Sequence, residues 1–312
     1  MSISAYRDMD KSFSARTVPW MVIGGLTDDA VTVEEAIKLG GLDVTVSKRA
    51  MTYTDRFGNQ RPSSKRFMLA RDTDDAEFEV VSGSYEPVQF AEALGILAEI
   101  NPKVSAAGTL RGGRHGFMVV EVPGSPEVEA LAHDDPHRLF GVVRTSHDRT
   151  KAIEFAVMPL RGKCMNMLPL KSLTKGAPQR WSIVHTTNAK KRLAEATKMV
   201  EGTQRYAEVY GRQVEQLIAT PTSRETGEQI LRSVLKSAPR TDDAIAAILA
   251  LWEHDNTVGF QGSAWGLTNA VNSYMQWERV GGNPESRMIG AMQGTTYRYT
   301  NQTATRALEA AK

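Results

Sequence analysis

The spacing of apolar residues changes once along the chain, and this change limits the folds that the chain can adopt. Up to about residue 187, short segments alternate apolar and polar residues, which is typical of strands. From Asn188 onward, apolar residues recur with the spacing of one helix face. Because runs of strands followed by runs of helices favour an α+β fold, the sequence predicts an N-terminal antiparallel β meander with packed helices, followed by an all-helical C-terminal half.

Two domains are expected from this division. Residues 1–187 are expected to form an α+β core, and residues 188–312 a helical domain that ends in a polar arm. The core begins with a helix, three strands and a second helix, expected at 32–38, 42–46, 65–71, 78–81 and 89–100. Helices of the second domain are expected near 188–219, 223–237, 241–254 and 263–280.

Charge is segregated along the chain. The formal net charge is only +2, but residues 41–71 hold seven basic residues against two acidic ones. Residues 72–143 hold thirteen acidic against four basic residues, net −9, and residues 144–192 hold eleven basic against two acidic, net +9. A polyanion is the usual partner of such a positive field. The alternative is that the basic and acidic segments neutralise each other across a sheet or a subunit interface.

Basic residues are interleaved with aromatic ones, in the pairs Arg49 with Tyr53, Arg56 with Phe57, Arg66 with Phe67, and Arg180 with Trp181. Single-stranded nucleic acid needs both backbone neutralisation and ring faces on which bases stack. Strand alternation allows the opposite interpretation, in which Phe67 is a core residue. The candidate nucleic-acid contacts are Lys48, Arg49, Arg56, Arg61, Lys65, Arg66, Arg111, Arg114, Arg149, Lys151, Arg161 and Lys163.

Several function classes lack their motifs. The sequence has no G-x-x-x-x-G-K-[ST] segment and no G-x-G-x-x-G that opens a helix, which argues against an ATPase and against a nucleotide cofactor. No apolar run approaches the roughly 18 residues of a membrane helix, and no signal peptide is visible, so no membrane association is expected. The one cysteine, Cys164, excludes an intramolecular disulfide and suits a reducing cytoplasm.

Metal binding and catalysis have weaker candidates. His133 and His137 have the spacing of two ligands on a helix, but the intervening Asp135-Pro136 disfavours that helix, and a solvated loop is the preferred interpretation. Cys164 lies in a basic segment that could lower the pKa of its thiol, yet a structural cysteine is favoured. We therefore predict no metal, no cofactor and no catalytic residue. An enzyme that pairs Cys164 with a histidine stays open as a third hypothesis.

An ordered set of local patterns resembles a phage- and plasmid-type protein family known as a domain of unknown function. The patterns span roughly residues 19–277. They are Pro19-Trp20, residues 83–89, residues 107–114, Thr145-Ser146-His147-Asp148, Arg161 with Cys164 and Asn166, His185-Thr186 with Asn188, and Trp265 with Asn269-Ala270-Val271.

A second resemblance implies an activity. The helix, three-strand meander and helix of residues 32–100 are similar to the core of single-strand annealing recombinases, phage proteins of the RecT and Redβ type. The resemblance implies ATP-independent DNA annealing during phage-type homologous recombination, a ring or filament homo-oligomer, and a basic groove for the DNA. It also implies a bacterial cytoplasm and, as a further partner, a phage exonuclease.

The leading hypothesis is therefore an ATP-independent protein that binds single-stranded DNA and anneals complementary strands. The alternative is a phage structural or interaction protein whose basic face meets another protein and which has no nucleic-acid activity.

Overall fold

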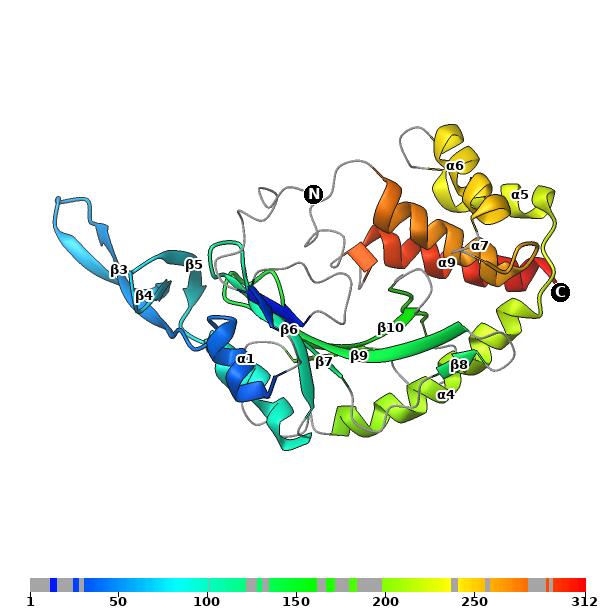
Figure 1. Cartoon of the computed structure of the whole chain (residues 1–312). Coiled ribbons are helices and arrows are strands. Elements are labelled where there is room, and N and C mark those ends of the chain that lie inside the picture. Colours follow the sequence, from blue (N-terminus) through cyan, green and yellow to red (C-terminus); the bar gives the residue numbers. More distant parts are fainter. Residues whose placement is uncertain are drawn as a thin grey trace. The chain divides into compact units, whose positions relative to one another are not determined.

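The computed structural model (Figure 1) gives the architecture of most of the chain. It describes residues 12–15, 25–27, 31–100, 102–121, 128–130, 135–161, 167–171, 180–183, 198–236, 241–255, 259–279, 290–291 and 294–312. Two compact units are interleaved in the sequence. Unit 1 comprises Met1–Pro123, Gly141–Ala156 and Arg180–Glu201, and unit 2 comprises Gly124–Phe140, Val157–Gln179 and Gly202–Lys312. The predicted domain boundary at 187/188 lies outside the described residues and stays a prediction.

The larger sheet has eight strands in the order β11-β10-β9-β7-β6-β1-β2, with β8 paired to β9. Its pairings are antiparallel wherever a register is described, except for β1 with β2, which are parallel. The strands are β1 (Ser12–Ala15), β2 (Gly25–Thr27), β6 (Lys103–Leu110), β7 (His115–Glu121), β8 (Val128–Ala130), β9 (Asp135–Ser146), β10 (Ile153–Arg161) and β11 (Arg180–Ile183).

A separate three-stranded antiparallel sheet, drawn in blue to cyan in Figure 1, has the order β3-β4-β5. Its strands are β3 (Val46–Thr54), β4 (Gln60–Arg71) and β5 (Glu77–Ser82), and two short helices flank them in sequence, α1 (Val33–Leu39) and α2 (Phe90–Gly95). The 3-10 turn η2 (Ile96–Ile100) follows α2. The base of this sheet is apolar, because Val46, Leu69, Phe78, Val81 and Tyr85 form a buried cluster.

Helix α1 begins where the sequence places it. Thr32 accepts a hydrogen bond from the backbone N–H of Glu35 at 3.2 Å, and the Glu35 carboxylate accepts one from the backbone N–H of Thr32 at 2.9 Å. This reciprocal capping box satisfies two N–H groups that the first helical turn leaves open. Gly40 caps the other end, and an added Cβ there would crowd the backbone of Ala36 and Gly108, at 3.0 and 3.1 Å.

Unit 2 contains most of the helix α4 (Lys198–Ile218), from Gly202 onward, and the helices α5 (Arg224–Leu235), α6 (Thr241–His254), α7 (Ala264–Ser273) and α9 (Thr295–Ala310). A π-helical turn, η3 (Tyr274–Glu278), continues α7. The polar tail expected as an arm forms α9, which contacts α7. Its threonines explain why a polar sequence packs there: Thr300 and Thr303 are fully buried, and Asn272 donates a hydrogen bond to Thr300 at 3.0 Å.

The α+β class with antiparallel sheets is confirmed, but the finer description holds only in part. Strands are not confined to an N-terminal meander: β9, β10 and β11 continue through the middle of the chain to Ile183. β9 pairs with β7, β10 with β9 and β11 with β10, so these strands enlarge the main sheet, whereas the predicted meander is a sheet of its own. Among the described residues, no helix has the length and apolar character needed to cross a membrane.

Candidate nucleic-acid interface

The strands β3 and β4 form a hairpin whose two ends differ. Near its base, Val46 and Leu69 belong to the buried cluster. Further out, residues 50–66 include no buried side chain, and we call this segment the outer hairpin. It carries four cations, Arg56, Arg61, Lys65 and Arg66, against a single carboxylate, Asp55. The outer hairpin is therefore an exposed, strongly basic ribbon.

The tip of the outer hairpin is held in one conformation by Asp55. Its carboxylate accepts hydrogen bonds from the backbone N–H groups of Phe57 and Asn59, both at 2.9 Å, and from Nε of Arg61 at 3.0 Å. The bond from Asn59, followed by that from Arg61, lowers the pKa of Asp55 below its usual value, so the carboxylate stays ionised. Gly58 adopts φ +84°, a conformation that favours glycine and closes the turn.

Two aromatic rings of the outer hairpin face solvent. Phe57 is 73% exposed, and the guanidinium of Arg56 lies 4.6 Å from its ring centroid. Tyr53 is 56% exposed and is paired in register with Arg61 on the opposite strand. Phe67 differs from both, because it packs against the buried cluster at the base of the sheet. The structure thus separates two aromatic residues at the surface from one that serves the core.

The outer hairpin also has cations that are not engaged in the fold. Lys65 and Arg66 are exposed, and neither forms an ion pair with a described residue. Arg56 has its ring contact with Phe57, and Arg61 has its ion pair with Asp55. Surface ion pairs of this kind are weak, so all four side chains of this group can be offered to a polyanion.

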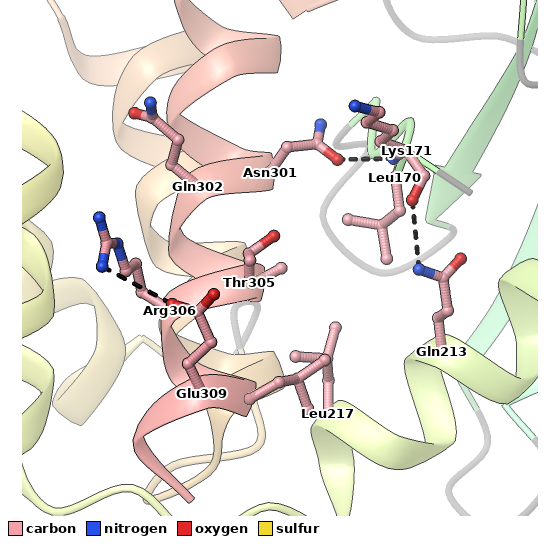
Figure 2. A pocket seen from close by; sticks show the side chains of 11 residues that line it. Leu170, Lys171, Gln213, Leu217, Asn301, Gln302, Thr305, Arg306 and Glu309 are labelled. Carbon is pink, nitrogen blue, oxygen red and sulfur yellow. Dashed lines mark hydrogen bonds and ion pairs between the residues drawn. The ribbon is translucent and has the colours of Figure 1, made fainter. Parts of the chain in front are cut away.

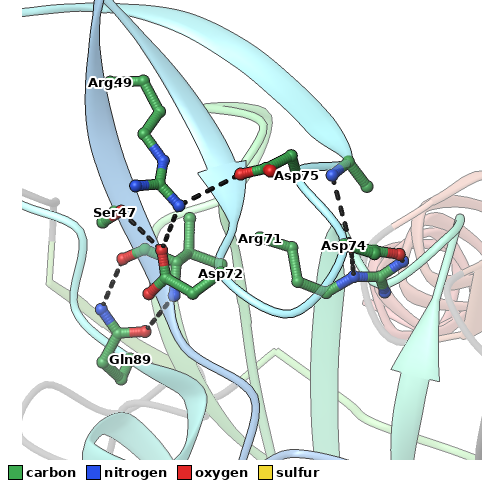
Figure 3. Close-up of polar contacts among 9 residues, drawn as sticks. Ser47, Arg49, Arg71, Asp72, Asp74, Asp75 and Gln89 are labelled. Atoms are coloured by element: carbon green, nitrogen blue, oxygen red, sulfur yellow. Dashed lines mark hydrogen bonds and ion pairs between the residues drawn. The ribbon is translucent and has the colours of Figure 1, made fainter.

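At the base of the hairpin, the predicted contacts Lys48 and Arg49 have partners. Nζ of Lys48 donates to the carbonyl oxygens of Gly83 and Tyr85, at 3.1 and 3.0 Å. Arg49 reaches the carboxylates of Asp72 and Asp75, at 3.0 and 3.2 Å (Figure 3). These two cations hold the strand ends and the turns of the small sheet together.

Figure 3 shows two further sets of polar contacts at the base of the hairpin. The Gln89 side-chain amide accepts a hydrogen bond from the Val46 N–H and donates one to the Val46 carbonyl, both at 2.9 Å. Arg71 pairs with Asp74 at 2.7 Å. The acidic turn 72–75, which belongs to the net negative segment 72–143, is therefore in part neutralised by arginines of its own sheet.

Four more predicted contacts lie on two turns of the larger sheet, which we call the two-turn cluster (residues 111–115 and 147–151). The turns are joined by a hydrogen bond from the His147 N–H to the Arg114 carbonyl at 2.8 Å. Arg114 donates to the carbonyl of Glu77 at 3.0 Å, and Arg149 donates to that of Val80 at 3.4 Å. Both acceptors belong to β5, so these two arginines bond to backbone carbonyls of the small sheet.

The other two cations of the two-turn cluster are Arg111 and Lys151. Arg111 adopts φ +55°, a left-handed conformation that is uncommon for a residue with a side chain. Lys151 is half-buried, and burial, followed by the field of Arg144, lowers the pKa of its ammonium. Arg144 itself is paired with Glu154.

The centre of the two-turn cluster is a hydrogen bond between His115 and Asp148 that sequence reasoning missed. Nε2 of His115 lies 2.7 Å from the carboxylate of Asp148, and Thr150 donates a hydrogen bond to the same carboxylate. Burial lowers the pKa of His115, and Asp148 only partly offsets this. Burial acts to raise the pKa of Asp148, but the hydrogen bonds of Thr150 and His115 outweigh it and lower the pKa to about 2. At neutral pH, a neutral imidazole therefore donates to an ionised carboxylate.

Of the two remaining predicted contacts, Arg161 and Lys163, only Arg161 lies within the described residues. Arg161 is only 1% exposed, with its guanidinium 5.6 Å from the ring centroid of Phe260. Lys163 and Cys164 lie outside the described residues, as does His133. His137 is buried in unit 2, where Nδ1 lies 3.0 Å from the hydroxyl of Tyr210. Within the described ranges, no group of three histidine, cysteine, aspartate or glutamate side chains is placed to hold a metal ion.

A cavity of about 370 Å³ lies between α4 and α9 in unit 2 (Figure 2). Two polar side chains that line the cavity hydrogen-bond to the backbone of Lys171. Asn301 accepts from its N–H at 2.6 Å, and Gln213 donates to its carbonyl at 3.2 Å. Arg306 pairs with Glu309 at 3.6 Å along α9. These contacts serve the packing of unit 2 and do not combine into an acid–base pair.

Comparison with known proteins places the chain in a family. The model of the family described as domain of unknown function DUF932 matches residues 77–311, about three quarters of the chain. The chain belongs to this family. The DUF932 match begins at the first residue of β5 and therefore includes the two-turn cluster but not β3, β4 or the outer hairpin. No curated protein and no solved structure matches the chain.

Proposed function

We propose that the protein binds single-stranded DNA through the outer hairpin and anneals complementary strands without ATP. The observation that carries the proposal is the exposed ribbon itself, on which four cations and two solvent-facing rings stand against one carboxylate. A cation track neutralises the phosphate backbone, and rings provide stacking faces, which together are the two requirements of single-strand binding.

The arrangement of the small sheet supports annealing as the use of that binding. In chain order, α1, the antiparallel strands β3, β4 and β5, and α2 give the helix, meander and helix that resemble the annealing recombinases. The DUF932 assignment covers only the last part of this segment and names no activity. The step from binding to annealing therefore rests on the resemblance in architecture.

The energy for annealing would come from base pairing. Neutralising phosphates lowers the repulsion between two strands and releases condensed counterions. The protein then needs no nucleotide hydrolysis, in keeping with a sequence without a phosphate-binding loop motif.

The proposal also includes the assembly of the protein, its cellular location and the process in which it acts. The segments 72–143, net −9, and 144–192, net +9, carry complementary charges that would meet head to tail between copies in a ring or filament. We propose a bacterial cytoplasm as the location and phage-type recombination as the process, with a phage exonuclease as a partner.

Annealing of two complementary oligonucleotides tests the proposal directly. Purified protein should accelerate duplex formation without ATP and in the presence of a chelator. Its affinity for a single strand should fall with salt, with a log–log slope of roughly −0.7 for each phosphate contact. Light scattering on the same samples should report an oligomer larger than a dimer.

The alternative, an interaction protein with a protein partner, gives different results in the same experiment. It predicts duplex formation at the protein-free rate and only weak binding to oligonucleotides. A monomer with and without DNA would contradict the proposed ring or filament.

A further inference from the structure

Phe57 is the most exposed of the large apolar side chains in the described part of the chain, and it stands at the tip of the outer hairpin. Exposed apolar residues are common singly and need no explanation by themselves. Phe57 differs because hydrogen bonds hold the turn on which it stands. The backbone N–H of Phe57 donates to Asp55, and Asp55 also holds Asn59 and Arg61. A ring on such a braced turn loses little conformational freedom when it binds a partner.

A cation accompanies each exposed ring of the outer hairpin. Arg56 lies against the ring of Phe57 at 4.6 Å. Arg61 stands directly opposite Tyr53 in the β3–β4 register, and directly opposed residues of antiparallel strands project from the same face. The outer hairpin therefore offers a ring with a cation at two levels, one at the tip and one on the strands. Lys65 and Arg66 extend the positive charge toward the base.

We propose that Phe57 and Tyr53 stack on unpaired bases and thereby make the outer hairpin selective for single strands over duplex. This inference rests on the proposed function and adds the source of its selectivity. Phosphate contacts alone do not read bases, and both single strands and duplexes present phosphates. In a duplex, each base is already stacked on its neighbours, so only an unpaired base can offer its face to a protein ring.

A lipid surface is the other partner that can attract exposed rings among cations. Interfacial insertion requires an apolar tip with its cations at the headgroup level. Here the tip also carries the ionised Asp55, whose carboxylate is hydrogen-bonded to Asn59 and Arg61. Burying that carboxylate in an apolar layer would cost desolvation energy. The outer hairpin therefore fits a nucleic acid better than a membrane.

The test uses the whole protein and a single-stranded oligonucleotide that contains the fluorescent base 2-aminopurine, whose emission reports stacking. The variants are Phe57→Ala and Tyr53→Ala, with Phe57→Trp to restore a ring and Trp277→Ala as a control, because Trp277 is an exposed aromatic in unit 2. Circular dichroism and melting temperature check that each variant folds.

We expect Phe57→Ala to lower single-strand affinity at least about fivefold, the lower end of the range for one stacked base. Its duplex affinity should change by less than about twofold, since phosphate contacts remain. The change in 2-aminopurine emission on binding should be lost in Phe57→Ala and return in Phe57→Trp. The control Trp277→Ala should behave like the wild type.

Two results would overturn the inference, and they differ from a failure of the proposed function. If the wild type binds the oligonucleotide but Phe57→Ala and Tyr53→Ala keep its affinity and fluorescence, single-strand binding stands and stacking is wrong. If Phe57→Ala instead loses binding to anionic phospholipid vesicles with no change toward oligonucleotides, the rings serve a membrane. A wild type that binds no oligonucleotide at any salt concentration contradicts the proposed function itself.

Discussion

The outer hairpin and the two-turn cluster carry four cations each within unit 1, yet they differ in what surrounds those cations. On the outer hairpin, Lys65 and Arg66 are exposed and form no ion pair with a described residue. In the two-turn cluster, Arg114 and Arg149 donate to backbone carbonyls of β5, and His115 is hydrogen-bonded to Asp148. The same residue types can thus hold a fold together or stand ready for a ligand, and only their hydrogen bonds tell which.

The largest effect is expected from breaking the hydrogen bond between His115 and Asp148 at the centre of the two-turn cluster. Replacing Asp148 by alanine removes the charged acceptor of both the buried His115 Nε2–H and the Thr150 hydroxyl, and leaves these two groups only each other, 3.1 Å apart. Hydrogen bonds to a charged group contribute about 1.5–3 kcal/mol, so we expect Asp148→Ala to lower the free energy of unfolding by about 2 kcal/mol. Urea denaturation measures it, and an unchanged unfolding midpoint would contradict the structural role of the pair.

The next effect concerns the outer hairpin. Charge reversal of Lys65 and Arg66 to Glu removes two cations and adds two repulsive charges, so affinity for single-stranded DNA should fall at least about tenfold, equally for all sequences. Fluorescence anisotropy at fixed salt measures it. The matched control reverses Lys171 and Lys312, two exposed lysines of unit 2, and should retain wild-type affinity. Equal losses in both variants would indicate a nonspecific effect of net charge.

Removing Arg114 and Arg149 tests whether the cations of the two-turn cluster support the fold or bind DNA. The double variant Arg114→Ala, Arg149→Ala should destabilise the protein by about 1 kcal/mol, since exposed hydrogen bonds contribute little each. Its affinity for single-stranded DNA should stay within about threefold of the wild type. A tenfold loss of affinity with unchanged stability would place these arginines at the nucleic-acid interface, as the sequence alone suggests.

A smaller effect is expected when pH falls. His115 has a pKa below its usual 6.5 in the folded protein, so the unfolded chain takes up its proton first. Stability should therefore decrease as pH falls below about 6.5 and through the lowered pKa of His115. Asp148, with a folded pKa of about 2 against an ordinary 3.8, adds a further loss between about pH 4 and 2. In His115→Gln, the first of these losses should be absent from denaturation curves recorded at several pH values.

The smallest expected effect is the change in stability caused by charge reversal on the outer hairpin. Lys65→Glu with Arg66→Glu should change the free energy of unfolding by no more than about 0.5 kcal/mol, as for other exposed sites. Differential scanning calorimetry checks it. A clear drop in melting temperature would show that these cations support the fold, and the contrast with the two-turn cluster would disappear.

Much of the local structure could be predicted, because its causes lie within a few residues. The Thr32–Glu35 capping box is present as the sequence indicates. The helix expected at 223–237 is α5, and its N-cap Ser223 accepts a hydrogen bond from the backbone N–H of Thr226 at 3.2 Å. Caps and helix faces depend on neighbours three or four positions away, which the sequence lists in order.

The first strand of the small sheet was predicted in the wrong place. The alternating segment 42–46 precedes the strand, and β3 runs from Val46 to Thr54. Alternation marks a strand only when one face is buried. Beyond Arg49 no side chain of β3 is buried, so this part of the strand shows no apolar pattern. The exposure that makes the outer hairpin a candidate interface is also the reason that periodicity missed its first strand.

The sequence by itself determined the α+β class, the helix ends and the places where positive charge gathers, because periodicity, caps and charge are local properties of the chain. The tertiary structure decided which cations remain available. His115 and Asp148 are 33 positions apart, and Arg149 is 69 positions from its acceptor Val80, so no local pattern announces either contact. Whether an arginine meets a carbonyl, a carboxylate or water depends on which strands fold beside it, and that is settled only when the sheets form.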